Sequence, residues 1–285
     1  TDLSLAQQTD LVAFWNLDEA SGNRADSFNP TTDNAISLDG STMALNADAL
    51  VAPLSATTTG YWSAWVKPTD ATPTSAEVLL SFGDTNANEY IRMTITTSGE
   101  LYGDCKISGN NQWAFDTDNV VFADNTWTNV ALVHDGVTPN LYVNGVLQSV
   151  TFIVSTDKTK WLNDATGLDN GRIGCLNTNS GGNTQFFDGA IDNVKIWSDA
   201  TQTTQIADYN MNETSGTRAD SINGYDATVI GTPDWISLST LLKDNNTVGS
   251  LEYTAGYVWR WTDKSANGYL MQQDTVSQQP EYISS

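Results

Sequence analysis

The sequence predicts an all-β protein in which two antiparallel sheets pack face to face, as a sandwich or a jelly roll. Long helical periodicity is nearly absent from its 285 residues. Short runs of alternating apolar and polar residues recur instead, and Gly, Asn, Asp and Thr bound them. One boundary is Asn144-Gly145, which indicates a hairpin because both central residues of a type I′ turn need positive φ.

The expected strands follow one another closely from residue 61 onward. In chain order they are Tyr61–Lys67, Val78–Phe82, Tyr90–Thr96, Leu101–Tyr102, Thr126–Val133, Asn140–Val143 and Val146–Leu147. Pro68 ends the first strand, and Ser98-Gly99 joins the third to the fourth as a hairpin. The polar stretches Ser108–Asp118 and Thr156–Asn170 are expected to be long loops.

The chain is strongly acidic, with 34 Asp and Glu against 12 Lys and Arg and a formal net charge of −22. Such a chain repels phosphate backbones and anionic headgroups, which argues against nucleic acid and membrane surfaces as partners. No apolar run approaches the roughly 18 residues that a membrane helix needs, so we expect no membrane insertion. The acidic residues either form a solvated surface or in part hold a divalent cation.

One segment of the chain occurs twice. Ala13–Asn29 returns as Ala207–Asn223, with ten of the seventeen positions identical and with Trp15/Tyr209 and Leu17/Met211 as conservative pairs. The repeat indicates that one folded unit opens near residue 11 and closes near 198, and that something with the same opening follows. The predicted division is therefore an N-terminal extension (1–10), the sandwich (11–198), a linker with the partial repeat (199–236), and a C-terminal extension or start of a further domain (237–285).

Four groups of residues resemble one known family. They are Leu17–Gly22 with Ala25–Ser27, Ala64–Pro68, Asp124–Gly136 with Leu141–Gly145, and Gly171–Gly174 with Phe187–Trp197. In this order they are similar to motifs of laminin-G-like, concanavalin A-like jelly-roll domains of the lectin/glucanase superfold. The resemblance implies a jelly roll over residues 11–198, followed by a C-terminal extension that is mostly irregular or β.

The closing strand suggests a metal site. Its apolar residues change parity at Asp192-Asn193, which predicts a β-bulge there. The resemblance implies a calcium ion between this aspartate and the opening Asp-Ser loop, and so nominates Asp192, Asp26 and Asn29 as ligands. Calcium takes about six to eight oxygens, so backbone carbonyls and waters must complete the set. The alternative is that the two aspartates are acceptors that cap turns.

Three aromatic residues in the expected loops, Trp113, Phe115 and Trp161, are candidates for ligand binding. A ring face in a polar loop can stack on a sugar ring, or it can anchor the loop against the sandwich. Cys105 and Cys175 are the two cysteines of the chain. They could form one disulfide in an oxidising compartment, or remain as buried free thiols.

The sequence contains no recognisable catalytic constellation. His134 is the single histidine, which leaves no His cluster for zinc and little prospect of a Ser-His-Asp triad. Laminarinase-type members of the superfold carry an E-x-D-x-x-E strand of catalytic carboxylates, and this chain has no such stretch. We therefore do not expect an enzyme.

The first functional hypothesis is a non-catalytic carbohydrate- or surface-binding module, stabilised by calcium. It would belong to an extracellular, cell-surface or virion-surface protein and bind a glycan or another cell-surface ligand. The alternative is an assembly component, such as a virion fibre, head-decoration or adhesin segment. Its C-terminal extension would contact neighbouring subunits of a homo-oligomer, because an incomplete opening can find its partner strands in a neighbour.

Overall fold

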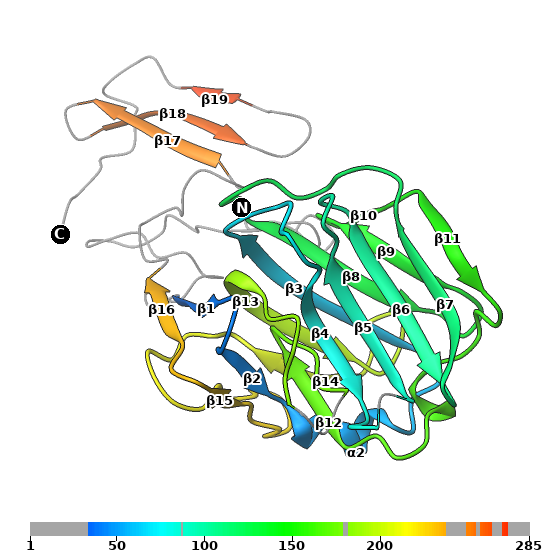
Figure 1. Ribbon diagram of the computed structural model, residues 1–285. Helices are drawn as coiled ribbons and strands as arrows, with labels where there is room; N and C mark the ends of the chain where they lie inside the picture. Colours follow the sequence, from blue (N-terminus) through cyan, green and yellow to red (C-terminus); the bar gives the residue numbers. More distant parts are fainter. Residues whose placement is uncertain are drawn as a thin grey trace. The chain divides into compact units, whose positions relative to one another are not determined.

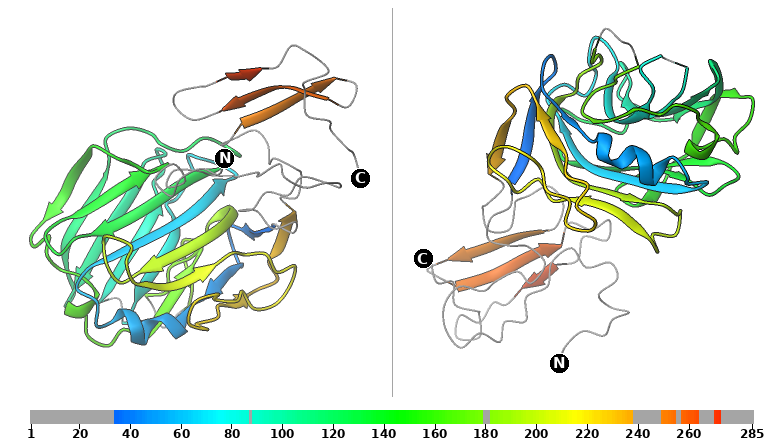
Figure 2. Two further views of the ribbon diagram at one scale, coloured as in Figure 1. Left: turned by 180° about the vertical axis from the view of Figure 1, so that it is seen from behind. Right: turned by 90° about the horizontal axis from the view of Figure 1, so that it is seen from below.

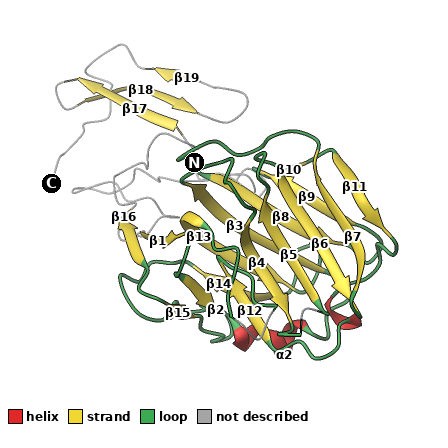
Figure 3. Cartoon of the chain, in the orientation of Figure 1, coloured by secondary structure: helices red, strands yellow, loops and turns green. Residues whose placement is uncertain are grey.

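The computed structural model describes residues 34–86, 88–178, 182–237, 249–254, 257–263 and 270–272. Strands dominate these residues, and the few helical turns gather at one end of the sandwich (Figure 3). The helical elements are η1 (Asp48–Leu50), α2 (Val51–Leu54) and η2 (Leu162–Asp164). The predicted all-β fold class is confirmed.

The first sheet has eight strands, and the closing strand β13 (Asp188–Trp197) lies inside it. Its other strands are β10 (Val146–Leu147), β9 (Pro139–Val143), β8 (Thr128–His134), β3 (Gly60–Pro68), β1 (Asn34–Asp39), β16 (Asp234–Ser237) and β14 (Gln205–Tyr209). The order is β10-β9-β8-β3-β13-β1-β16, and β14 also pairs with β13. One edge of β13 therefore holds β3, whereas the other edge is shared between β1 and β14.

The second sheet also has eight strands, in the order β11-β7-β6-β5-β4-β12-β2-β15. The strands are β11 (Val150–Ser155), β7 (Asn110–Thr117), β6 (Leu101–Ile107), β5 (Tyr90–Ile95), β4 (Glu77–Gly83), β12 (Asn170–Ile173), β2 (Ala44–Asn46) and β15 (Thr228–Ile230). Figures 1 and 2 show the two sheets as stacked layers of a jelly-roll sandwich. The β9–β10 turn has positive φ at Asn144 (49°) and Gly145 (76°), as predicted.

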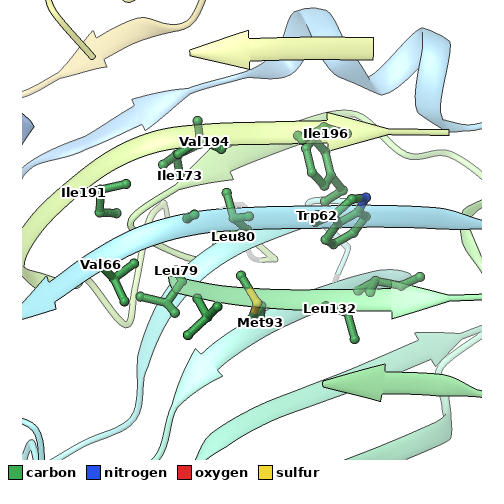
Figure 4. Close-up of a cluster of buried hydrophobic side chains, with 14 of the residues drawn as sticks. Trp62, Val66, Leu79, Leu80, Met93, Leu132, Ile173, Ile191, Val194 and Ile196 are labelled. Carbon is green, nitrogen blue, oxygen red and sulfur yellow. The ribbon is translucent and has the colours of Figure 1, made fainter. Parts of the chain in front are cut away.

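The core lies between the two sheets. Apolar side chains of both sheets meet there, among them Trp62 of β3 and Leu80 of β4 (Figure 4). Trp62, Trp113 and Trp161 are the largest fully buried apolar side chains. Gly60 is required beside this cluster, because a Cβ on it would lie 2.9 Å from the Trp161 ring.

The compact unit is longer than the repeat predicted. It runs from Asn34 to Ile236, so it does not close near residue 198. The reason is that the segment after 198 supplies strands to both sheets: β14 pairs with β13, β15 with β2, and β16 with β1. The predicted linker and partial repeat (199–236) are thus part of the sandwich.

The described residues after 237 form a separate three-stranded antiparallel sheet. Its strands are β17 (Gly249–Thr254), β18 (Tyr257–Asp263) and β19 (Leu270–Gln272). The predicted N-terminal extension, together with Asp26 and Asn29, lies outside the described residues. Over the part of the chain that is described, no helix is long and apolar enough to cross a membrane.

Of the two alternatives for the cysteines, the structure has the buried free thiols: Cys105 and Cys175 are both free and buried. Cys105 lies on β6 and Cys175 follows β12, and strands β5 and β4 separate the two. With neighbouring strands about 4.8 Å apart, this amounts to about 14 Å. A disulfide bridges Cα atoms less than about 7 Å apart. Burial raises the pKa of the Cys175 thiol to about 12, so it stays protonated.

Candidate functional site

The outer face of the second sheet carries a continuous row of polar residues. Side chains directly opposite in a sheet lie on the same face. The strand register aligns Arg172 of β12 with Ser81 of β4, Ser81 with Arg92 of β5, and Arg92 with Asp104 of β6. Residues two positions away along these strands share that face. We call the set Tyr90, Arg92, Tyr102, Asp104, Lys106 and Arg172 the polar face.

Asp104 is the centre of the polar face. Its carboxylate receives two hydrogen bonds from Arg92, Nε to Oδ1 at 2.7 Å and Nη2 to Oδ2 at 3.0 Å. The hydroxyls of Tyr90 and Tyr102 also donate to it. The Asp104 side chain is 5% exposed and that of Arg92 17%. A bidentate pair of this kind fixes the geometry of its neighbours as well as their charge.

The two tyrosine rings flank the Arg92 guanidinium. Its Cζ lies 5.2 Å from the centroid of the Tyr90 ring and 5.9 Å from that of Tyr102. Lys106 Nζ lies 5.9 Å from the Tyr90 centroid. Burial, and secondarily the charge of Asp104, raises the pKa of Tyr90 to about 12. The hydroxyl therefore remains a hydrogen-bond donor throughout the physiological pH range.

A second arginine is held at the other end of the row. Arg172 forms an ion pair with Asp48, and its Nε donates to Asn183 Oδ1 at 3.2 Å. Arg92 Nη1 in turn donates to Gln185 Oε1 at 2.5 Å. Residues 183 and 185 therefore connect two arginines that lie two strands, or about 10 Å, apart. The row is thus a fixed array of donors and acceptors with half-buried rings beside it.

The predicted aromatic ligand residues lie elsewhere. Trp113 and Phe115 are on β7, inside the stretch expected to be a loop, and Trp161 precedes η2. All three are fully buried, so none offers a ring face to a ligand. Trp113 and Phe115 lie on a strand and not in the expected loop, whereas Trp161 lies in its expected loop and anchors it against the sandwich, which is the alternative stated above. Alternation explains the error: the polar residues of β7 alternate with aromatic residues that face the core.

The buried aromatic rings form a stack between the two sheets. Trp113 lies 6.3 Å from Trp161, and Trp161 lies 4.9 Å from the His134 ring. His134 Nδ1 accepts from the Gly136 amide, so Nε2 carries the proton and donates to the Lys158 carbonyl at 2.9 Å. The single histidine is therefore part of the core.

The predicted bulge in the closing strand is confirmed. The register of β13 against β3 shifts between Asp192 and Lys195, and Asn193 has a φ of 47°. The buried Asp192 carboxylate accepts from the Asn193 amide at 2.7 Å and from the Asn193 side chain at 2.9 Å. Within the described residues, no group of three or more His, Cys, Asp or Glu could hold a metal ion. The other two nominated ligands, Asp26 and Asn29, fall outside them, so the calcium site stays a prediction.

The polar face was not predicted from the sequence, although the alternation of polar and apolar residues in two of its strands indicates it. Tyr90 and Arg92 alternate with Ile91 and Met93 in a strand that was predicted. Tyr102, Asp104 and Lys106 show the same alternation in the next strand. A period of two in both strands places the polar members of each on one face, and that face is the site.

Fold and site together define a jelly-roll module with a built polar face on one sheet. The sequence model of the concanavalin A-like lectin/glucanases superfamily matches residues 39–207, and the chain belongs to this superfamily. A comparison with curated protein sequences gives no significant match.

Several solved structures share the fold. A Bacteroides ovatus protein, provisionally described as a carbohydrate binding protein, has a TM-score of 0.52 at 15% identity, covering 78% of this chain and 65% of its own. The CBM40 domain of the Ruminococcus gnavus IT-sialidase has a TM-score of 0.50 at 20% identity, covering 59% and 92%. A NanB sialidase from Streptococcus pneumoniae has a TM-score of 0.50 at 17% identity, covering 64% and 28%. At these identities the similarity concerns the fold.

Proposed function

We propose that the chain is a non-catalytic carbohydrate-binding module and that the polar face holds the sugar. The observation that carries the proposal is the hub of Arg92, Asp104, Tyr90 and Tyr102, held by mutual hydrogen bonds on the outer face of the second sheet. The names of the Bacteroides ovatus protein and of the CBM40 domain, both with this fold, support it.

The chemistry of the polar face suits a sugar. Hydroxyl groups of a sugar both donate and accept, and the face offers guanidinium donors, a carboxylate and amide acceptors at fixed positions. Half-buried tyrosine rings offer apolar surface for the C–H face of a pyranose while their hydroxyls stay paired. Because these groups already hold one another in place, a ligand would not have to order them, which lowers the entropic cost of binding.

The arrangement of the acids supports binding without catalysis. Glycoside hydrolysis uses two carboxyl groups on opposite sides of the scissile bond, about 5 to 10 Å apart. On the polar face Asp104 is fully engaged by Arg92 and the two tyrosines. The carboxylate of Asp48 pairs with Arg172 and also accepts from the Gly171 amide. Neither acid is arranged to transfer a proton to a substrate.

We further place the module on an extracellular or displayed protein, in keeping with a glycan as ligand. Calcium remains part of the hypothesis as a stabiliser. Adding calcium to chelated protein should raise its Tm if Asp26, Asn29 and Asp192 share an ion. An unchanged Tm would refute the calcium site. It would not affect the proposal for the polar face, because none of these three residues belongs to that face.

A glycan array followed by calorimetry with the best ligand tests the proposal. Tyr90→Ala and Tyr102→Ala should each weaken binding about tenfold or more, equivalent to about 1.4 kcal/mol. Tyr142→Ala is the matched control, because Tyr142 is a half-buried tyrosine on β9 in the other sheet, beside Tyr61 at 6.4 Å.

The control also locates a rival site. Tyr61, Tyr142 and Trp197 form an aromatic group on the first sheet, with Tyr61 and Trp197 centroids 5.3 Å apart. If Tyr142→Ala abolishes binding while the Tyr90 and Tyr102 variants retain it, the site on the polar face is refuted. If no glycan binds the folded full-length chain, the carbohydrate-binding function itself is refuted.

A further inference from the structure

Both arginines of the polar face are already neutralised by carboxylates. Arg92 holds Asp104 through two parallel hydrogen bonds, at 2.7 and 3.0 Å, one to each carboxylate oxygen. Arg172 forms an ion pair with Asp48, whose Oδ1 also accepts from the Gly171 amide at 2.9 Å. The two pairs together carry no net charge.

The pair at the centre of the face cannot easily be opened by a ligand. A carboxylate offers about four lone-pair sites. Asp104 fills them with two hydrogen bonds from Arg92 and one from each of the hydroxyls of Tyr90 and Tyr102. The Asp104 side chain is 5% exposed. An anion that drew Arg92 away would leave a buried carboxylate without its cation, which is strongly unfavourable.

The remaining charges of the face do not favour an anion either. Among the described residues, Lys106 is in no ion pair, and it is a single ammonium group. On the other side of β6, Asp116 of β7 lies opposite Tyr102 and therefore on the same face. Burial, together with the charges of Glu100 and Asp118, raises the pKa of Asp116. The carboxylates here and the net charge of −22 both repel an approaching anion.

Neutralised groups can still recognise hydroxyls. A guanidinium has five N–H donors, and Arg92 uses two on Asp104 and one on Gln185. The other two have no hydrogen-bond partner among the described residues. A sugar hydroxyl can accept such a bond without bringing a charge that has to be desolvated. The face is thus supplied with donors but has little net positive charge to offer.

We propose that the polar face selects an uncharged sugar and rejects glycans in which a carboxylate or sulfate is placed on it. The inference rests on the proposed function, because it concerns the same face. Asp104 and Asp48 determine this specificity, since each takes from its arginine the charge that an anionic sugar would need. They act by neutralising a cation and need not contact the sugar themselves.

Matched sugars test the selectivity on the full-length chain. A glycan array is printed with neutral glycans, each beside its sulfated form and its uronide, in which a carboxylate replaces the C6 alcohol. Calorimetry then compares the best neutral glycan with its uronide and with the uncharged methyl ester of that uronide. We expect the uronide to bind about tenfold or more weakly, equivalent to about 1.4 kcal/mol, and the ester to recover most of the loss. The Kd of the neutral glycan should not depend on salt concentration, because the ligand brings no charge to be screened.

Asparagine variants test the two acids. Asp48→Asn and Asp104→Asn each free the charge of one arginine and keep the shape of the side chain. Each should reduce the preference for the neutral glycan over its uronide by about tenfold, whatever its effect on the affinity for the neutral glycan. The Asp48 side chain is 41% exposed, so Asp48→Asn keeps the test available if Asp104→Asn fails to fold. Asp234→Asn is the matched control, because it removes one charge from an exposed position of β16 in the other sheet.

The outcomes separate this inference from the proposed function. A uronide or sulfated glycan that binds as tightly as its neutral parent, or more tightly, would overturn the selectivity and leave the polar face as a sugar site. An unchanged preference in both Asp48→Asn and Asp104→Asn, equal to that of Asp234→Asn, would overturn the role of the two acids. Absence of binding to every glycan would overturn the proposed function, and the selectivity with it.

Discussion

The two faces of the second sheet are built from the same strands, but the inner face packs in the core and the outer face is polar. On the inner face, Trp113 and Phe115 of β7 and Met93 of β5 are fully buried. On the outer face of the same sheet, Arg92 and Asp104 hold each other in a polar hub. Each strand contributes to both faces, because successive side chains point in opposite directions.

Parity within a strand, more than residue type, therefore decides what a side chain does in this sheet. The tryptophans are the residues most suited to stack on a sugar, yet both candidates lie on the core side. Tyr102, one strand from Trp113, and Tyr90, two strands away, are smaller and half-buried, and they lie on the outer face. A shift of one residue in the register would exchange the two sets.

The largest expected difference between the faces is in stability. Trp113→Ala removes a fully buried ring and its hydrogen bond to the Lys160 carbonyl, so it should lower the free energy of unfolding by about 3–5 kcal/mol. Tyr102→Ala, on the neighbouring strand and the outer face, should lower it by about 1 kcal/mol. Denaturant titration of both variants measures the contrast. Equal losses would mean that the outer face is as much a structural core as the inner one.

Asp104 tests whether the outer face is held together by its charge. Asp104→Asn keeps the shape of the side chain but leaves Arg92 without a charged partner in a mostly buried position. We expect a loss of about 1.5–3 kcal/mol, the range for hydrogen bonds to charged groups. Binding of the glycan should also weaken, because the Asn side chain keeps one acceptor oxygen of the two that Arg92, Tyr90 and Tyr102 share. Retained stability together with retained binding would contradict the role of the hub in the polar face.

Much of this contrast could be predicted from the sequence, and its limits have physical causes. The alternation of Tyr90–Thr96 and the Asn144-Gly145 turn predicted strands correctly, because both are local signals. The parity change at Asp192 predicted the bulge for the same reason. The burial of Trp161, in contrast, depends on packing against Trp62 at 5.0 Å from a distant strand. No local pattern encodes such a contact.

The pairing of the segment after residue 198 could not be predicted from local sequence patterns either. The repeat marked Ala207–Asn223 as a second opening segment, but it did not indicate that β14 pairs with β13 of the same sandwich. The chain then continues into β15, which pairs with Ala44–Asn46, almost two hundred residues away in the chain. The candidate site has the same limitation, because the row from Arg172 to Asp104 crosses four strands whose order only the fold determines.

The smallest expected effect concerns Glu77, an acidic residue at the edge of the inner face. Glu77 of β4 lies opposite Ile95, and its Oε2 accepts from the Asp188 amide of β13 at 3.0 Å. Burial, which the nearby charges of Asp188 and Asp70 reinforce, raises the pKa of Glu77 to about 7 despite that hydrogen bond. The folded chain therefore keeps this proton above pH 4.5, the ordinary pKa of a glutamate, where the unfolded chain has lost it. Its contribution to stability is complete below that ordinary pKa and is lost as the pH rises through about 7.

Glu77→Gln keeps an acceptor for the Asp188 amide and removes the titration. The Tm of Glu77→Gln, measured relative to that of the unsubstituted chain, should therefore be higher at pH 8 than at pH 5. Scanning calorimetry over that range measures it, and Glu100→Gln controls for the loss of one carboxylate from a chain of net charge −22. If the Tm of Glu77→Gln and that of the control depend on pH in the same way, Glu77 is solvated and does not belong to the buried inner face. If the Tm of Glu77→Gln instead rises above that of the control as the pH increases, Glu77 is shielded from water, because a carboxyl group in water does not keep its proton near neutral pH. The buried inner face of the sheet then extends to this carboxylate.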